Sequence, residues 1–540
     1  MVGEMTEPPN RSPDDSNKSY SAWITNNLRS WVVRNSKDLS LLLTAIIVTG
    51  LSCAYYLSTM LSFTRPGFTL DDSWIHLQYA RTIYEGVPWE YSPGYPSTGS
   101  TSPLWSVILS VLFLFSTDAV NLAWGAYTVS LLFYIASSFL VGKIVYTYTN
   151  SIQWGVIGIA GFSIIPRNTW LMLSGMETPL FVFVLLLSIF VLDNTDIKYD
   201  LILGVLVGVA YLSRPEGIIV AFAVPIRFLI LAFKRKVDAR RVATLFISAG
   251  LAVLVVLPWV MHCLSVTGLP LPDTFYAKVH IPLEYEIEAW NFWWTLFVGE
   301  MPHLVVGVFV GIILIVRGKP FPWLFPVILT VLYRLTAPYA SLINNVRYLL
   351  PVFDLFFLTG IIASAWILDF ILTGIFRLPE GNETKLIAIA LTIIVLIVPL
   401  VPHYVGQATY YGRAVKTVND LHVNIGLWLA ENTPEDAVFA THDAGAVRFI
   451  SNRSMIDLAG LVSPDIIHGN MTPRETLSYL RHHGCNYFVY FNDLFAYWTR
   501  FLSYQAYEMV YTVTIPPEVH VGGGRPTMSV YQIFWEYTEY

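Results

Sequence analysis

The chain has 540 residues, of which 55% are hydrophobic and only 13% are charged, and its net charge is −6 at pH 7. Soluble chains usually carry about a quarter charged residues, so this composition and a mean hydropathy of +0.55 exclude an ordinary soluble globular protein. The basic residues are few and dispersed, and no nucleic-acid partner is predicted. The three cysteines lie far apart and form neither a metal-binding spacing nor a disulfide framework.

The first 38 residues are polar, and we expect them to form a disordered cytoplasmic tail. This stretch is too long and too hydrophilic to begin a cleaved signal peptide. The apolar segment Leu39–Leu61 is therefore interpreted as the first membrane crossing. Basic residues in short segments mark the cytoplasmic side, so the lysines and arginines before Leu39 place the N-terminus inside. The loop 62–102 then lies outside.

Residues 39–404 contain repeated apolar segments that predict a polytopic α-helical membrane domain. The basic cluster Lys234–Arg241 is placed inside, and counting outward from it gives about 11 transmembrane helices. An even number of crossings must separate the first external loop from the next one, so either Pro103–Phe115 or Ile152–Ile165 does not cross fully. In this topology every loop with notable polar residues lies on the external face.

Residues 405–540 have a different character and predict a small α/β domain outside the membrane. The stretch "AVKTVNDLHVNIGLWLAENTP" has the pattern of an amphipathic helix. Three other stretches are typical of strands, namely "DAVFATHD", "CNYFVYFN" and "PTMSVYQIFWEY". His442 and Asp443 fall at a strand-to-helix turn, and we interpret Asp443 as the N-cap of the helix beginning in "AGAVRF".

The first external loop carries two adjacent carboxylates, Asp71 and Asp72, in the stretch "FTLDDSWIHLQYARTIYEGVPWEYSPGYPSTGSTSPLW". One interpretation is structural, because an Asp at a helix start accepts backbone N–H bonds and complements the helix dipole. The following residues, Ser73–Tyr84, then form a helix lying in the membrane interface. The other interpretation is catalytic. Capping and catalysis are equally compatible with this stretch alone, although capping needs only one of the two acids.

Glycosyl transfer is the chemistry that these residues favour. An acceptor hydroxyl loses its proton as it attacks an anomeric carbon, and a carboxylate within hydrogen-bond reach serves as the base. One such base is enough for inversion, whereas retention needs a second, nucleophilic carboxylate. A lipid-phosphate leaving group needs cationic donors. The cations predicted on the same face are Arg214, Lys278 and Arg347.

Taken together, the motifs resemble those of polyprenyl-phosphate-sugar-dependent glycosyltransferases of the GT-C superfamily. The acidic pair is followed by "YAR", "EG", a Pro-Gly turn and "TSPLW", and four stretches come later in order: "SGMETP", "SRPEG", "LPDTFYAK" and "RYLLP". Within the superfamily the chain is most similar to mycobacterial terminal arabinofuranosyltransferases and their bacterial and archaeal relatives. The tail motif "TPEDAVFATHDAGAVRFISNRSMIDLAGL" extends the resemblance over nearly the whole chain from Leu39.

The resemblance implies a role for individual residues. It makes Asp71 or Asp72 the catalytic base and Glu177 a second acidic residue that binds the phosphate or a metal. A divalent cation, Mg²⁺ or Mn²⁺, would have Asp72 and Glu177 as its ligands. The predicted substrate-binding residues are Arg347 for the lipid phosphate, Lys278 and Tyr276 in a loop that closes over the donor, and Arg214, Glu216, His76 and Tyr348. The "SWIH" segment departs from the smaller residues of the relatives, so the arabinose assignment is left open.

Each of these residues also has a structural interpretation. Glu177 stands before Thr178–Pro179 and is placed to cap a helix. Arg214 and Glu216 are spaced to form a local ion pair around Pro215. Arg347 is also placed to snorkel at the membrane interface, and His76 to be a polar residue on a helix face.

The sequence thus predicts a plasma-membrane glycosyltransferase that moves a sugar from a polyprenyl-phosphate donor to a hydroxyl of an extracytoplasmic glycan, lipid or protein. Membrane lipids are its other partners. One alternative is a transporter or flippase of lipid-linked substrates, in which ionisable groups should gather at mid-membrane. Another is a non-catalytic receptor or assembly subunit. The charge placement favours the enzyme, because the ionisable groups gather in loops on one face.

Overall fold

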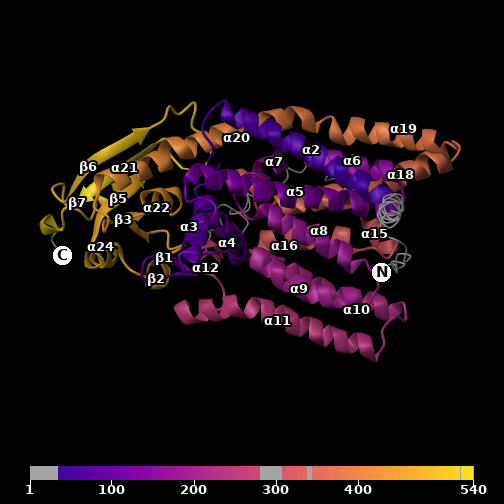
Figure 1. Cartoon of the computed structure of the whole chain (residues 1–540), viewed down its shortest axis with the longest axis horizontal. Coiled ribbons are helices and arrows are strands. Elements are labelled where there is room, and N and C mark those ends of the chain that lie inside the picture. The colour runs from indigo at the N-terminus through magenta and orange to yellow at the C-terminus, as the bar shows by residue number, and fades with distance from the viewer. Residues whose placement is uncertain (1–34, 280–306, 310, 337–342, 523, 539–540) are drawn as a thin grey trace, which may run out of the picture.

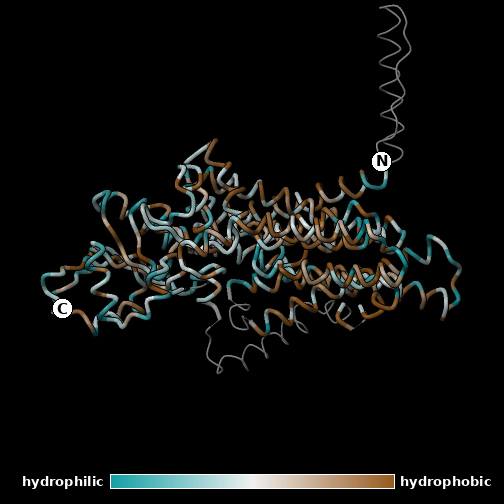
Figure 2. Tube along the Cα trace, turned by 90° about the horizontal axis from the view of Figure 1, so that it is seen from below, coloured by the Kyte–Doolittle hydropathy of each residue, from teal (hydrophilic) through white to brown (hydrophobic). Residues whose placement is uncertain are grey.

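A computed structural model of the protein describes residues 35–279, 307–309, 311–336, 343–522 and 524–538. A long body of helices carries a smaller α/β domain at one end (Figure 1). Apolar residues dominate the helical body, whereas polar residues are more frequent toward the α/β end (Figure 2). The predicted body of apolar helices with a C-terminal α/β domain is thus the observed architecture.

The helical body is built mainly from long, nearly parallel helices. Its elements are α2 (Ser36–Leu61), α5 (Ala119–Thr149), α6 (Ile152–Ser163), α7 (Pro166–Met172), α8 (Thr178–Leu192), α9 (Lys198–Ser213), η2 (Pro215–Ile218), α10 (Ile219–Phe233), α11 (Ala239–Thr267), α15 (Ile312–Val316), α16 (Phe321–Thr336), α17 (Ile343–Val346), α18 (Leu350–Asp369), η4 (Phe370–Ile375), α19 (Asn382–Thr392), η5 (Ile393–Ile397) and α20 (Leu400–Val418). At the end next to the α/β domain, called the outer end below, lie α3 (Asp72–Tyr84), β1 (Glu90–Ser92), β2 (Tyr95–Pro96), α4 (Pro103–Ser110), η1 (Val111–Leu114) and α12 (Asp273–Val279).

Within the described residues, five helices are long and apolar enough to cross a membrane, or up to six if one bent pair of helices forms a single span. The five are Ser36–Leu61, Ala119–Thr149, Pro215–Phe233, Ala239–Thr267 and Asn344–Ile375. Several further apolar helices are only 10–17 residues long. The predicted total of about 11 crossings requires some of these shorter helices to cross, and the number stays a prediction.

Of the two segments considered as non-crossing, α4 is the one that stays at the outer end. It continues directly into η1 as one short apolar helix, Pro103–Leu114, and α4 packs mainly against α3. The other candidate, α6, is followed after a short break by α7, and both pack within the helical body. The structure therefore favours Pro103–Phe115 as the segment that does not cross.

Helix α3 is buried rather than lying on the bilayer surface, so that part of the prediction was wrong. Nine of its 13 residues are buried, because the α/β domain covers its outer side. The Trp74 ring lies 5.2 Å from the Phe449 ring of that domain, and the Tyr91 hydroxyl donates a 2.5 Å bond to the carbonyl of Ala444. The acidic pair thus begins a helix held between two parts of the molecule.

The α/β domain contains a five-stranded mixed sheet in the order β4-β3-β5-β7-β6. Strand β3 pairs in parallel with β4 and β5, and β7 pairs antiparallel with β5 and β6. The elements of the domain are η6 (Asn419–Val423), α21 (Asn424–Asn432), β3 (Val438–Thr441), α22 (Ala446–Ser451), β4 (Ser454–Asp457), α23 (Pro464–His468), α24 (Pro473–His482), β5 (Cys485–Phe491), α25 (Asn492–Trp498), β6 (Tyr507–Thr514), β7 (Thr527–Ile533) and η7 (Trp535–Tyr537). Three of these strands, β3, β5 and β7, were predicted.

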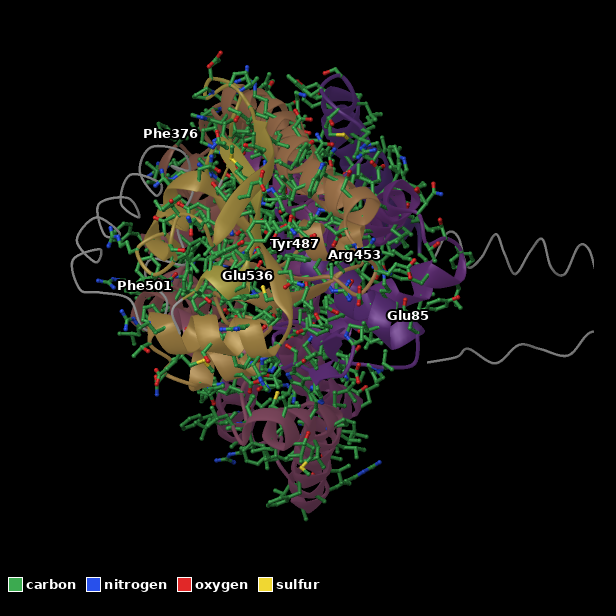
Figure 3. All side chains as sticks on the ribbon, turned by 90° about the vertical axis from the view of Figure 1, so that its left-hand side faces the viewer. Glu85, Phe376, Arg453, Tyr487, Phe501 and Glu536 are labelled. Carbon is green, nitrogen blue, oxygen red and sulfur yellow. The ribbon has the colours of Figure 1, made fainter. Side chains whose placement is uncertain are left out.

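Each face of the sheet is covered by a separate apolar core. Successive strand residues point to opposite faces, so Phe439 and Val489 pack with the core that includes α21, whereas Ala440 and Phe488 pack with α24 and α25. In Figure 3, which faces this domain, Tyr487 of β5 lies near the centre and Glu85, at the end of α3, lies at the edge. Helix α20 runs without a break across the predicted boundary between residues 404 and 405, so the chosen domain boundaries stay predictions.

Candidate active site

Four helix ends meet at the outer end of the helical body and bring distant polar residues together. Asp72 is the first residue of α3, and Glu177 immediately precedes α8. Arg214 lies between α9 and η2, and Arg347 lies between α17 and α18. A helix end leaves backbone groups unpaired and lets side chains point beyond the apolar segment. The site is therefore located where the crossing helices end beneath α3 and the α/β domain.

Asp72 and Arg347 form the closest ion pair of this site. Arg347 Nη1 donates a 2.6 Å bond to Asp72 Oδ2, and Arg347 Nη2 donates a 3.0 Å bond to the Tyr348 hydroxyl. The Arg347 side chain is buried, whereas the Asp72 side chain is 35% exposed. Arg347 is therefore not a snorkelling residue on the lipid-facing surface, and Asp72 presents a reachable carboxylate next to a fixed positive charge.

Glu177 is buried in a cationic environment. Its Oε2 lies 3.2 Å from His76 Nε2, and its Oε1 lies 3.6 Å from Arg214 Nε. Although Glu177 stands at the start of α8, its side chain makes no capping hydrogen bond there. Its observed contacts therefore match the site interpretation and not the helix-cap interpretation.

Arg214 contacts two carboxylates through Nε and has two further N–H groups, Nη1 and Nη2, that are not used in these contacts. Its Nε lies 3.4 Å from Glu216 Oε2, so the predicted local ion pair is present. Its Nη1 and Nη2 atoms are buried and have no hydrogen-bond partner among the described residues, and the guanidinium carbon lies 4.6 Å from the Tyr348 ring centroid. An arginine offers five donors, and leaving buried donors unpaired is unfavourable. The two free Nη groups therefore point to an oxygen-rich ligand.

Both arginines face one cavity of about 350 Å³. Its lining residues are Thr101, Glu177, Tyr211, Arg214, Pro215, Glu216, Ile218, Leu271, Thr274, Phe275, Leu332, Arg347 and Tyr348. Asp72 adjoins the cavity through its bond to Arg347. The walls thus combine two guanidinium groups with an apolar surface, which is the combination that a phosphate attached to a hydrocarbon chain requires.

Asp71 has a different set of partners from Asp72. Its two carboxylate oxygens accept 2.7 Å bonds from the backbone N–H groups of Gly445 and Ala446, and it makes no capping bond to α3. Asp71 therefore caps α22 of the α/β domain. The prediction that Asp443 caps this helix was wrong, because Asp443 Oδ2 instead contacts His422 Nε2 at 2.9 Å.

This cap makes attachment of the α/β domain sensitive to pH. Burial raises the pKa of Asp71 from 3.8 to about 6. Between pH 4 and 6 the folded protein keeps a proton that the unfolded chain has already released, so stability should fall as pH rises through that window. We expect the Tm to decrease by a few degrees between pH 4 and 6 and the slope to become shallower in Asp71→Asn. A thermal unfolding series by near-UV circular dichroism tests this, and an equal slope in both proteins would contradict it.

The loop predicted to close over the donor is only partly described. Tyr276 lies on α12, and its ring centroid is 6.0 Å from that of His468 in the α/β domain. The side chain of Lys278 lies outside the described residues. Asp273, also on α12, accepts a 2.8 Å hydrogen bond from His468 Nε2 through its Oδ1 atom. Helix α12 is thus fastened to the α/β domain, and Phe275 and Thr274, rather than Tyr276, line the cavity.

The residues present do not fit a resident divalent cation. Within the described part of the chain, no group of three or more His, Cys, Asp or Glu side chains is placed to hold a metal ion. The two proposed ligands also have other partners, since Asp72 pairs with Arg347 and Glu177 lies between His76 and Arg214. Mg²⁺ is usually bound by one or two carboxylates together with waters and substrate phosphates, but here both candidate carboxylates are engaged by these other side chains.

Eight of the lining residues were not selected from the sequence, and Thr101, Tyr211 and Phe275 are three of them. Each lies within or next to a motif that was noticed. Thr101 begins "TSPLW", Phe275 belongs to "LPDTFYAK", and Tyr211 stands two residues before "SRPEG". Reading whole motifs rather than only their charged members would have found them.

The predicted GT-C fold is matched by solved structures. Two structures of ArnT from Cupriavidus metallidurans, in the apo state and bound to undecaprenyl phosphate, match with a TM-score of 0.54 and 12% identity. Each match covers 90% of this chain, and 98% and 97% of the respective ArnT chains. The Archaeoglobus fulgidus oligosaccharyltransferase tethered with an acceptor peptide matches with a TM-score of 0.53 and 12% identity, over 85% of this chain and 69% of that one.

The sequence comparisons match a smaller part of the chain than the structural ones. A family model described as "Domain of unknown function (DUF8728)" matches residues 408–531, a region that includes four strands of the sheet and most of β7. No curated protein matches the chain. The structural likeness therefore shows the fold, and the chemistry has to be argued from the residues of the site.

Proposed function

We propose that this protein is a membrane glycosyltransferase that transfers a sugar from a polyprenyl-phosphate donor to a hydroxyl of an extracytoplasmic acceptor. The observation that carries the proposal is the cavity in which Arg214, with two unpaired Nη groups, and Arg347 lie beside the carboxylate of Asp72. Two guanidinium groups can bind the donor phosphate and stabilise it as it leaves.

In the proposed reaction Asp72 is the base. The acceptor oxygen forms a bond to the anomeric carbon, the bond from that carbon to the phosphate oxygen breaks, and its electron pair stays on the phosphate. The acceptor proton passes to Asp72. A phosphate bound by Arg347 competes with Asp72 for the guanidinium, which leaves the half-exposed carboxylate able to accept that proton.

Inversion at the anomeric carbon is part of the proposal. Retention requires a second carboxylate that is free to attack the sugar. The other nearby acids, Glu177 and Glu216, are both held by Arg214, and Glu177 also contacts His76. These contacts support a single displacement with one base, in which Glu177 and His76 act as positioning residues for Arg214.

A polyprenyl phosphate fits the apolar part of the cavity wall, formed by Tyr211, Leu271, Phe275 and Leu332 among others. The likeness to ArnT bound to undecaprenyl phosphate supports this donor class. An arabinofuranosyl group is the sugar that the sequence resemblance suggests. The acceptor is an extracytoplasmic glycan, lipid or protein, and we place the N-terminus in the cytoplasm and the site on the outer face of the plasma membrane.

The purified protein in nanodiscs, given polyprenyl-phosphate donors with a radiolabelled sugar and a membrane extract as acceptor, should release polyprenyl phosphate and label the acceptor. A flippase would move the intact donor between leaflets without breaking the sugar–phosphate bond. Donors that remain intact while they translocate would therefore overturn the proposal in favour of transport.

A further inference from the structure

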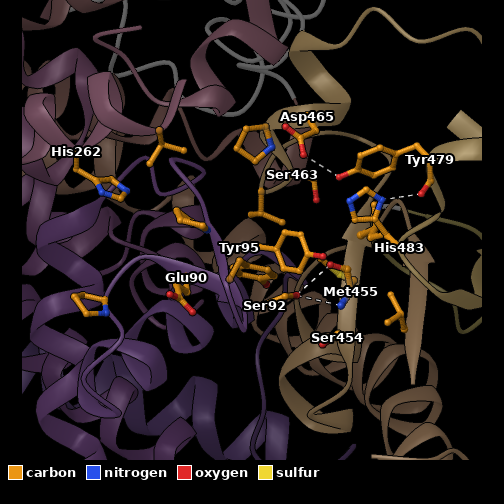
Figure 4. A pocket seen from close by; sticks show the side chains of 18 of the residues that line it. Glu90, Ser92, Tyr95, His262, Ser454, Met455, Ser463, Asp465, Tyr479 and His483 are labelled. Atoms are coloured by element: carbon orange, nitrogen blue, oxygen red, sulfur yellow. Dashed lines mark hydrogen bonds between the residues drawn. The ribbon is translucent and has the colours of Figure 1, made fainter. Parts of the chain in front are cut away.

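A second cavity, of about 560 Å³, lies between the β1–β2 hairpin and the α/β domain. The C-terminal part of α11 supplies a third wall through His262, Ser265 and Val266. In Figure 4, Glu90 and His262 lie on the side of the helical body, Asp465, Tyr479 and His483 lie on the side of the α/β domain, and Tyr95 lies between them. In the part of the chain that the structure describes, this cavity and the arginine-lined one have no lining residue in common.

The chemistry of this second cavity is that of a carbohydrate site. Rings and polar groups lie close together in it: the Tyr95 and His483 ring centroids lie 6.1 Å apart, and the Tyr479 hydroxyl donates a 3.0 Å bond to Asp465 Oδ2. The Tyr95 side chain is half exposed and offers a flat apolar face. A sugar presents C–H groups to such a face and hydroxyls to carboxylates.

The charges of the two cavities differ. The donor cavity contains two arginines, whereas the residues described as lining the second cavity include the carboxylates of Glu90 and Asp465, two histidines, and neither lysine nor arginine. A phosphate or carboxylate ligand would be repelled there, because like charges at close range are unfavourable. The second cavity therefore suits a neutral polyhydroxyl ligand.

One segment borders both cavities. Its Ser92 and Pro96 line the second cavity, and its Thr101 lines the donor cavity. Between them the chain is buried and fixed, since the hydroxyls of Ser97 and Tyr79 are 2.8 Å apart. A side chain at Gly99 would collide with the backbone of the α/β domain, as an added Cβ would lie 2.2 Å from the Leu461 carbonyl oxygen. A ligand in the second cavity is thus held at a set place relative to the donor.

We infer that the second cavity binds a neutral carbohydrate portion of the acceptor, and this role as an acceptor site rests on the proposed function. Asp465 and Glu90 accept hydrogen bonds from sugar hydroxyls, and Tyr95 packs on a sugar ring. The aromatic and acidic residues come from two separate parts of the chain, so the site exists only when the α/β domain is seated on the hairpin.

The test uses the labelled full-length protein in nanodiscs on a printed array of neutral, carboxylated and phosphorylated glycans. We expect binding to members of the neutral set. Asp465→Asn removes a carboxylate that binds sugar hydroxyls, and Tyr95→Ala removes the ring that packs on the sugar. Each substitution should weaken that binding on the order of 10-fold. Glu508→Gln, an exposed acid on β6, is the matched control and should bind as the unchanged protein does.

The outcomes separate this inference from the proposed reaction. Asp72→Asn should keep glycan binding, because Asp72 lies at the other cavity, even if it abolishes transfer. Glycan binding without any transfer would sink the proposed function and leave the carbohydrate site standing. Absence of binding to every neutral glycan, preference for the charged sets, or equal losses in the control variant would overturn the carbohydrate site.

Discussion

Replacing Asp72 by Asn is expected to lower the rate of sugar transfer by about 10²- to 10⁴-fold, the range that a positioned general base contributes. The Asn side chain keeps the shape of Asp72 and can still accept a bond from Arg347, but it cannot take up the acceptor proton. Donor binding should change much less than the rate. Single-turnover transfer with a labelled donor, alongside a titration of polyprenyl phosphate binding, measures the two effects separately.

The neighbouring substitution Asp71→Asn is the control, because the two changes are chemically identical and one residue apart. Asp71 accepts two backbone N–H bonds from the α/β domain, and an Asn can accept only through its single carbonyl oxygen. We therefore expect Asp71→Asn to lower the Tm and Asp72→Asn to leave it nearly unchanged. If Asp71→Asn abolished transfer at an unchanged Tm while Asp72→Asn remained active, the base would be Asp71 and the present assignment would fail.

The acidic pair also shows where inference from the sequence ends. Composition, apolar segments and the order of the motifs were sufficient to predict the helical body, the α/β domain and the gathering of the polar loops at one end of the helical body. The division of labour between Asp71 and Asp72 was not predictable, because the partner of Asp71 is the backbone at Gly445 and Ala446, about 370 positions away. Backbone N–H groups carry no sequence signature.

A similar limit applies to α3 and to the cavity walls. The pattern of Ser73–Tyr84 is that of an amphipathic helix, and a membrane interface or a second domain can cover its apolar side equally well. Only the tertiary structure shows that the α/β domain covers it. By contrast, Arg214, Glu216 and Glu177 could be selected in advance because charges near membrane segments are unfavourable unless they are paired or functional.

Arg347→Lys is expected to weaken polyprenyl phosphate binding by about 10- to 100-fold, the size of one or two lost charge-assisted hydrogen bonds. Lysine keeps the positive charge but cannot reproduce the planar fork that reaches Asp72 and Tyr348 at once. The effect should appear as a higher KM for the donor. Fluorescence titration of the nanodisc-embedded protein with undecaprenyl phosphate measures it directly.

Arg317→Lys is the matched control, since Arg317 follows α15 toward the opposite end of the helical body, 4.1 Å from the Trp366 ring. This variant should bind the lipid normally.

If Arg214 and Arg347 bind the same phosphate, Arg214→Lys should weaken binding in the same way. The two substitutions should then be non-additive, because each changes the position of the ligand that the other contacts. Strictly additive losses would place the two arginines on different ligands, and unchanged binding in Arg347→Lys would remove the phosphate from this cavity altogether.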